Sequence, residues 1–276
     1  MEIVTSIPEL RAARARHGAR SFGFVPTMGC LHRGHLALAD RAKAENELAG
    51  MSIFVNPTQF GPHEDFNRYP RQFDADCALC REHEVDLVFA PSVEEMYPAG
   101  AATFVDVGPL GERLEGSFRP GHFRGVATIV TKLFNLAQPQ RAYFGRKDAQ
   151  QLAVITTLAR DLDLPVVIVP CDTEREADGL ARSSRNTYLT AAERAVAPQL
   201  FLTLQHVCGM LKSGGDRETA EAEGRRRLQA AGFGPIDYLA VVDPHTFLPA
   251  DSGNRLIVVA AKLGTTRLID NMLVSA

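Results

Sequence analysis

The stretch from Phe24 to Leu38, FVPTMGCLHRGHLAL, predicts a strand, a tight turn and a helix start in immediate succession. The apolar run from Phe22 to Val25 has the composition of a short buried strand. After the turn, apolar residues recur with helical periodicity at Leu36, Leu38 and Ala39. A strand–helix unit that ends near Leu48 is therefore expected here.

The turn inside this unit is suited to binding an anion. The first turn of a helix presents unpaired backbone N–H groups and the positive end of the helix dipole, and both favour a phosphate. Gly29 and Gly34 lack a Cβ, so the chain can turn sharply at one and a ligand can approach the other. His32 and His35 lie one helical turn apart and can face the same anion. A lone His-x-x-His pair is more often structural, but the strand and the glycines favour a functional site.

Further strand–helix units follow, and two of them carry polar residues directly after the strand. The run 51–55 leads into Asn56-Pro57-Thr58-Gln59, and 142–144 leads into Gly145-Arg146-Lys147-Asp148. Other strands are predicted over 86–89, 103–107 and 164–170, and helices over 7–18, 73–83, 92–96, 126–137 and 149–162. This order predicts an α/β fold, a Rossmann-like parallel sheet with helices on both faces. Ligands bind such sheets beyond the carboxyl ends of the strands, where the polar residues lie.

The pattern changes after Thr190. Helices predicted over 191–212 and 218–230 precede three short strands, over 238–242, 255–261 and 266–269, without βαβ alternation. We therefore expect two domains, a Rossmann-like domain over 1–178 and a smaller C-terminal α+β domain over 179–276.

Charge, hydropathy and cysteine usage exclude several classes of protein. A net charge of −3 provides no broad basic field for nucleic acid or anionic lipid. The longest apolar runs are far shorter than the roughly 20 residues that span a bilayer, so no membrane association is expected. Five scattered cysteines argue against a disulfide framework, and Cys77-x-x-Cys80 has no second pair or histidine cluster to complete a zinc site. With no secretory apolar segment at the N-terminus, we expect a cytoplasmic protein.

Several separated stretches resemble one known family. The residues Pro26-Thr27-Met28-Gly29, followed by Leu31-His32 and Gly34-His35, are similar to the opening motif of the pantothenate synthetases, members of the His-x-Gly-His nucleotidyltransferase superfamily. NPTQFGPHEDFNRYPR over 56–71 resembles the second block of that family. Later blocks are matched by RPGHFRGV over 119–126, READGLARSSRNTYL over 175–189 and RLIDN over 267–271. Chance easily produces one His-x-Gly-His motif, but it does not easily produce all these stretches in order.

The resemblance implies a ligase that uses ATP to condense pantoate with β-alanine through a pantoyl adenylate, releasing AMP and pyrophosphate. In-line attack on the α-phosphorus requires charge neutralisation and orientation more than a protein base. By resemblance, the catalytic residues are His32, His35, Lys147, Ser183, Ser184 and Arg185. The nucleotide is also expected to contact Pro26, Thr27, Met28, Gly34, Gly145 and Asp148.

The same resemblance implies how the remaining ligands bind. Pantoate is expected at Met28, Asn56, Gln59 and Gln151, beside a mobile flap that carries Arg119, His122 and Arg124. Mg²⁺ is expected mainly on the phosphates of ATP, with Asp76 as the candidate protein ligand. A homodimer is expected, with residues 179–276 acting as a lid, and no nucleic-acid partner.

The chain departs from the family pattern at four positions, and other functions remain open. Arg146 replaces a usual Glu, Arg182 replaces a hydrophobic residue, and Arg33 and Glu174 are less typical, which bears on adenine contacts and the metal site. The nearest rival is another nucleotidyltransferase of the superfamily that acts on a nucleotide or phosphopantetheine. An aminoacyl-tRNA synthetase is disfavoured because the mildly acidic chain shows no RNA-binding surface. A nucleotide-binding module without turnover is the third alternative, which only an assay can exclude.

Overall fold

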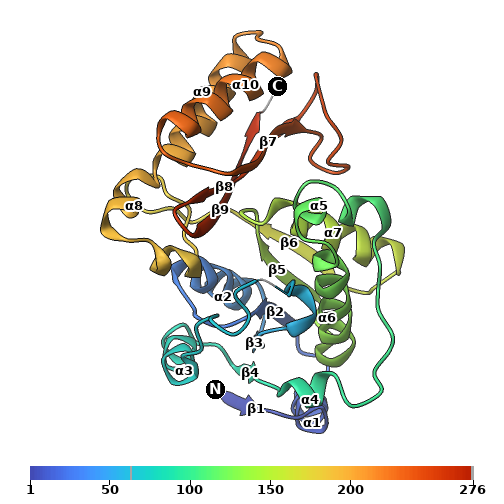
Figure 1. The fold of residues 1–276 in the computed structure, drawn as a ribbon. Helices are drawn as coiled ribbons and strands as arrows, with labels where there is room; N and C mark the ends of the chain where they lie inside the picture. The colour runs from blue at the N-terminus through green and yellow to red at the C-terminus, as the bar shows by residue number, and fades with distance from the viewer. Residues whose placement is uncertain (63, 275–276) are drawn as a thin grey trace.

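Two sheets divide the chain into a larger first part and a smaller second part (Figure 1). The computed structural model describes residues 1–62 and 64–274. Within these residues the first sheet has six parallel strands in the order β1-β4-β3-β2-β5-β6. The strands are β1 (Glu2–Val4), β2 (Phe22–Thr27), β3 (Leu48–Ile53), β4 (Leu87–Phe89), β5 (Arg141–Gly145) and β6 (Val167–Cys171). The predicted parallel sheet is thereby confirmed.

Helices cover both faces of this sheet, as predicted, because successive strand side chains point to opposite faces. Phe24 packs on one face in a core shared with α1 (Ile7–His17), α6 (His122–Ala137) and α7 (Ala149–Asp161). Its neighbour Val25 packs on the other face, in a core shared with α2 (Arg33–Glu45) and α3 (Phe73–Glu82). Shorter elements are α4 (Val93–Met96), α5 (Glu115–Phe118) and the 3₁₀ helices η1 (Pro57–Gln59) and η2 (Gly108–Gly111).

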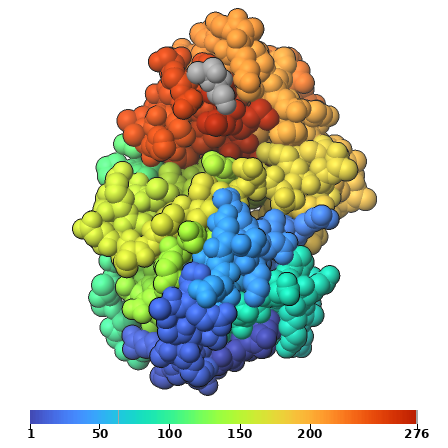
Figure 2. Space-filling view, turned by 180° about the vertical axis from the view of Figure 1, so that it is seen from behind, coloured from blue at the N-terminus to red at the C-terminus, as the bar shows by residue number. Residues whose placement is uncertain are grey.

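The second part has its own sheet and its own hydrophobic core. In the described residues, the antiparallel strands β7 (Ile236–Val242), β8 (Arg255–Leu263) and β9 (Thr266–Val274) lie in that order, with β8 in the centre. The helices are α8 (Ala191–Val196), α9 (Gln199–Lys212) and α10 (Arg217–Ala230), and the linker contains the 3₁₀ helix η3 (Ser184–Tyr188). Figure 2 shows this part, in orange and red, at one end of the molecule. The boundary after residue 178 stays a prediction, although Leu180 packs in the second core.

Three local predictions are wrong, and one short strand was missed. Residues 103–107 form no strand, because the N–H of Val105 donates to Oγ1 of Thr128 on α6 (2.9 Å) instead of to a neighbouring strand. The helix expected over 191–212 is divided into α8 and α9 at Pro198, whose missing N–H cannot continue a helix. The segment 108–125, expected to be a loop, contains η2, α5 and the first turn of α6, and β1 had not been predicted.

The helices and the cysteines bear on the expectations about membrane spans and disulfides. No helix in residues 1–62 and 64–274 has both the length and the apolar character needed to cross a membrane. All five cysteines are buried and free, in agreement with the predicted absence of a disulfide framework.

Candidate active site

The carboxyl ends of β2, β3 and β5 and the linker before η3 surround a cavity of about 220 Å³. This is the edge at which open α/β sheets bind ligands. The cavity is lined by all the residues to which the sequence assigned catalysis, nucleotide binding or pantoate binding: Pro26, Thr27, Met28, His32, Gly34, His35, Asn56, Gln59, Gly145, Lys147, Asp148, Gln151, Ser183, Ser184 and Arg185. The structure therefore brings these residues together, while their individual roles stay predictions.

His32 and His35 form a reciprocal cap at the start of α2. Nδ1 of His32 accepts a hydrogen bond from the N–H of Gly34 (3.1 Å), and Nδ1 of His35 accepts one from the N–H of His32 (3.4 Å). Burial and the positive charge of Lys147 lower the pKa of His32 to about 4, and burial together with His32 lowers that of His35 to about 3. Both rings are neutral at neutral pH. Because Nδ1 accepts in each ring, the proton lies on Nε2, which can donate to an anion.

The turn before α2 requires its two glycines. Gly29 has a φ of 79°, and a Cβ there would lie 2.9 Å from a carboxylate oxygen of Asp76. A Cβ at Gly34 would lie 2.9 Å from the ring of His32. The predicted sharp turn is therefore present at Gly29, whereas the space beside Gly34 is occupied by the ring of His32.

Asp76, the candidate metal ligand, is bound to the backbone of the turn between β2 and α2. Its carboxylate oxygens accept from the N–H groups of Cys30 (2.9 Å) and Leu31 (2.8 Å), and the side chain is 1% exposed. It does not line the central cavity. These contacts fix the turn between β2 and α2 that precedes the histidines, and the role of Asp76 toward a metal stays a prediction.

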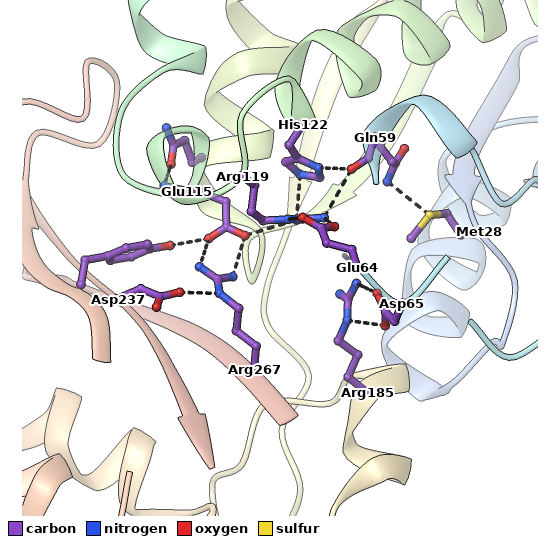
Figure 3. Close-up of polar contacts among 12 residues, drawn as sticks. Met28, Gln59, Glu64, Asp65, Glu115, Arg119, His122, Arg185, Asp237 and Arg267 are labelled. Atoms are coloured by element: carbon purple, nitrogen blue, oxygen red, sulfur yellow. Dashed lines mark hydrogen bonds and ion pairs between the residues drawn. The ribbon is translucent and has the colours of Figure 1, made fainter. Parts of the chain in front are cut away.

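The cations and hydroxyls of the site come from two other segments. Lys147 lies just before α7, close enough to His32 and His35 to lower the pKa of both. Arg185 donates through Nε and Nη2 to Asp65 (3.1 and 3.0 Å), as Figure 3 shows. The hydroxyl of Ser184 donates to the carbonyl of Cys30 (3.1 Å), which fastens the linker to the turn before α2.

The side of the cavity expected to bind pantoate has an amide and an apolar wall. Asn56 is 1% exposed and donates to Oε1 of Gln59 (2.9 Å), and its own oxygen accepts from the hydroxyl of Tyr97 (2.9 Å). Nε2 of Gln59 contacts the sulfur of Met28 at 3.2 Å (Figure 3). Asn56 is thus satisfied by the protein and orients Gln59. The wall is formed by one side of α6, at Val126, Ile129, Val130 and Leu133.

The three residues expected on a mobile flap do not line the central cavity. Arg119 donates to Glu64 (2.9 and 2.6 Å), and Nδ1 of His122 donates to the carbonyl of Gln59 (2.8 Å) in Figure 3. The guanidinium of Arg124 lies 4.3 Å from the centre of the Phe104 ring. The loop prediction is wrong for His122 and Arg124, because both residues belong to the first turn of α6.

A second cavity of about 500 Å³ adjoins the first and lies between the two parts of the chain. Lys147, Ser183 and Arg185 line both cavities, and Arg267 on β9 lines the second. Beside it, the carboxylate of Glu115 accepts from both terminal nitrogens of Arg267 (2.7 and 2.8 Å) and from Arg119 (3.2 Å), as Figure 3 shows. Glu115 could not be identified from the sequence, since Arg267 lies 152 residues further along the chain.

The four positions that depart from the family pattern divide into two pairs. Glu174 and Arg182 line the central cavity and face each other through a backbone hydrogen bond from the N–H of Arg182 to the carbonyl of Glu174 (2.9 Å). Arg33 and Arg146 do not line it, and Arg146 pairs with Asp172 (3.2 Å). The first pair therefore lies in the wall of the candidate site, and Arg146 contacts that wall through Asp172.

Comparisons with known proteins agree with this architecture. The family model described as pantoate-beta-alanine ligase matches residues 2–273. The pantothenate synthetase of Gluconobacter oxydans is 54% identical, over 99% of each chain. The crystal structure of the Thermus thermophilus pantothenate synthetase superposes with a TM-score of 0.95 at 51% identity over 100% of both chains. A Francisella tularensis pantoate-beta-alanine ligase, complexed with β,γ-ATP and β-alanine, superposes with a TM-score of 0.85 at 34% identity, covering 99% of this chain and 97% of that one.

Proposed function

This chain belongs to the pantoate-beta-alanine ligase family, and from that premise we propose how its residues carry out the ATP-dependent condensation of pantoate with β-alanine. In the first step a carboxylate oxygen of pantoate attacks the α-phosphorus of ATP, the bond to the β-phosphate oxygen breaks, and pyrophosphate leaves. In the second step the amine of β-alanine attacks the acyl carbon of the pantoyl adenylate, loses a proton, and AMP leaves. The observation that carries this proposal is the convergence of phosphate donors and amides from four segments on one cavity.

The triphosphate binds at the start of α2. There the neutral rings of His32 and His35 each offer an Nε2–H beside the positive end of the helix dipole. Lys147 adds a compact cation near both rings, and Arg185 adds a planar guanidinium. Donors of this kind stabilise the charge that develops on the phosphate oxygens in the transition state.

Pantoate binds between this phosphate site and α6. The amides of Gln59 and Gln151 hold its polar groups, Met28 lies beside Gln59, and the apolar residues of α6 cover its methyl groups. Because the attacking group is a carboxylate, which is ionised at neutral pH, the protein has to orient it and needs no base. Asn56 contributes indirectly by holding Gln59.

A magnesium ion carried by the nucleotide fits the donor set of the cavity. No cluster of three or more His, Cys, Asp or Glu side chains suited to a metal ion is found in the described ranges, so these residues offer no complete protein cage. Asp148 is a carboxylate on the cavity wall beside Lys147, and Mg²⁺ commonly takes one or two carboxylates together with substrate phosphates. Bound there, the ion would neutralise part of the charge on the phosphates.

We also propose a cytoplasmic homodimer that has small molecules as its only substrates. Five buried, free cysteines support a reducing compartment, and the net charge of −3 gives no basic field for nucleic acid. At the edge of the first sheet, Val167 on β6 is 60% exposed and the nearby Leu162 is 49% exposed, which is consistent with a contact surface. Sedimentation equilibrium measures the oligomeric state directly.

The experiment that tests the function is pyrophosphate exchange without an amine. With saturating Mg²⁺, ATP and pantoate, the protein should incorporate labelled pyrophosphate into ATP, and omission of pantoate should stop it. Lys147→Ala should slow exchange by about 10²–10³ and leave a measurable residual rate. Lys212→Ala, an exposed substitution on α9, should leave exchange at the wild-type rate. When β-alanine is added, ¹⁸O from the pantoate carboxylate should appear in AMP.

Each rival predicts a different outcome of this experiment. Release of ADP and phosphate would indicate an acyl phosphate and refute the adenylate. Exchange that depends on a nucleotide substrate in place of pantoate would indicate the other nucleotidyltransferases of the superfamily. Well-folded protein without any exchange would indicate a binding module that does not turn over.

A further inference from the structure

Strand β9 of the second part contacts the turn that carries Lys147 in the first part. The side-chain nitrogen of Asn271 on β9 donates to the backbone carbonyls of Arg146 (2.9 Å) and Lys147 (2.8 Å). A carboxamide nitrogen has two hydrogens, so these two bonds use its full donor capacity. Both acceptors lie in the turn between β5 and α7, directly before the helix begins.

The second part of the chain holds Asn271 firmly in this position. Asn271 pairs with Val258 in the antiparallel ladder of β8 and β9, and its N–H donates to a carboxylate oxygen of Asp270 (2.8 Å). Asp270 is 3% exposed and accepts from both terminal nitrogens of Arg175 (2.6 and 2.9 Å). The ladder and this ion pair fix the backbone of Asn271, so its amide acts as a rigid support for the turn.

Asn271 lies behind the site and not in it. It does not line the central cavity, whereas Lys147 and Asp148 do; all three line a small cavity on the side facing the second part. Its effect on a ligand must therefore pass through the backbone of the turn. Without its two bonds, the carbonyls of residues 146 and 147 lose their partner and the turn can rotate, which moves the Lys147 side chain away from the start of α2.

We propose that Asn271 is a positioning residue for the ligase reaction, which sets the Lys147 ammonium group against the phosphates from the second part of the chain. The proposal rests on the phosphate-binding role proposed above for Lys147. It goes beyond that role because it makes adenylate formation depend on where β9 docks. A substitution on β9 can then lower the rate without touching a substrate.

A double-mutant cycle distinguishes this role from a general contribution to folding. The rate constant of pyrophosphate exchange at saturating substrates is measured for wild type, Asn271→Ala, Lys147→Ala and the double variant. Loss of the two hydrogen bonds should slow exchange about tenfold in the wild-type background. In the Lys147→Ala background the same substitution should change the rate by less than about twofold, because the side chain that it positions is gone.

Two further variants provide the controls. Asn271→Asp has the same size but places a carboxylate against two carbonyls, so it should slow exchange at least as much as Asn271→Ala. Arg113→Met removes a different bond between the two parts, from Nη1 of Arg113 to the carbonyl of Thr246 (2.6 Å), and should leave exchange close to wild type. Thermal melts of all variants show whether each one is folded at the assay temperature.

The possible results separate this proposal from the proposed function. Equal fold-losses for Asn271→Ala in both backgrounds would overturn the positioning role while leaving the function intact. An Arg113→Met variant as slow as Asn271→Ala would also overturn the positioning role. Loss of any contact between the two parts would then be enough to slow exchange. Wild-type exchange by Lys147→Ala would refute the role of Lys147 itself, and the positioning role with it.

Discussion

Replacing Glu115 by Gln should destabilise the protein at neutral pH and remove part of the acid dependence of its stability. Glu115 is 6% exposed and accepts from Arg267 and Arg119, as Figure 3 shows. It also accepts from the hydroxyl of Tyr238 (2.9 Å). Burial alone would raise the pKa of this carboxyl, but the hydrogen bonds and positive charge of Arg267 outweigh burial and lower it to about 2. The ionised form is therefore strongly favoured in the folded state.

The size and sign of the effect follow from that pKa. A fall from the ordinary pKa of 4.5 to about 2 corresponds to about 3 kcal/mol, since each pKa unit corresponds to about 1.4 kcal/mol. Because the pKa is lower in the folded protein, this contribution is present in full above pH 4.5 and is lost as the pH falls from 4.5 towards 2. By about pH 3, about 2 kcal/mol of it should be gone.

Guanidinium unfolding followed by circular dichroism at several values of pH between about 3 and 7 measures this effect. The free energy of unfolding of wild type should exceed that of Glu115→Gln by about 3 kcal/mol at about pH 7, and the difference should narrow by about 2 kcal/mol at about pH 3. Glu82→Gln, an exposed substitution on α3, controls for the change in net charge. If the difference in free energy of unfolding between wild type and Glu115→Gln stays constant across this pH range, the lowered pKa of Glu115 is refuted.

Two further predictions concern the central cavity. His35→Ala should slow adenylate formation by about 10²–10³, because one aligned donor at the start of α2 is lost. With purified pantoyl adenylate and β-alanine, the variant should react at the wild-type rate. An equal defect in that second reaction would disprove the role assigned to His35. Gly125→Ala should raise the KM for pantoate several-fold, because its Cβ would lie 2.2 Å from the carbonyl of Thr58 and push η1, with Gln59, out of place. Gly209→Ala on α9, where the Cβ meets open space, is the matched control, and an unchanged KM in Gly125→Ala would show that η1 does not position pantoate.

The parts of the fold that could be predicted from sequence are those in which a local pattern agrees with the tertiary environment. Phe22–Thr27 is an apolar run that the sheet buries on both faces, and its composition alone predicted a strand. Strand β1 is only three residues long and begins with a glutamate, so no local pattern distinguishes it from a loop. Residues 103–107 show the opposite case. Their composition is typical of a strand, but they pack against α6 and pair with no neighbouring strand.

Some residues of the candidate site could likewise be placed from local sequence, whereas others depend on tertiary packing. Residues that follow strands, such as Asn56 and Lys147, could be placed at one edge of the sheet because parallel strands bring their carboxyl ends together. The role of Asp76 could not be predicted, since its bonds to two backbone amides depend on how α3 packs against the turn. The same holds for Asn271, whose contact with residues 146 and 147 depends on how the second part docks.

The bond from the hydroxyl of Ser184 to the carbonyl of Cys30 joins residues 154 positions apart, which has a consequence for the order of events during synthesis. A chain grows from its N-terminus at about 5–20 residues per second, so the turn before α2 leaves the ribosome many seconds before the linker that completes the phosphate site. Until then the growing chain has the histidines but neither Arg185 nor the serines. If ATP binds as proposed, a nascent chain lacks part of the phosphate site until the first sheet is complete, and the full affinity for ATP should arise only then.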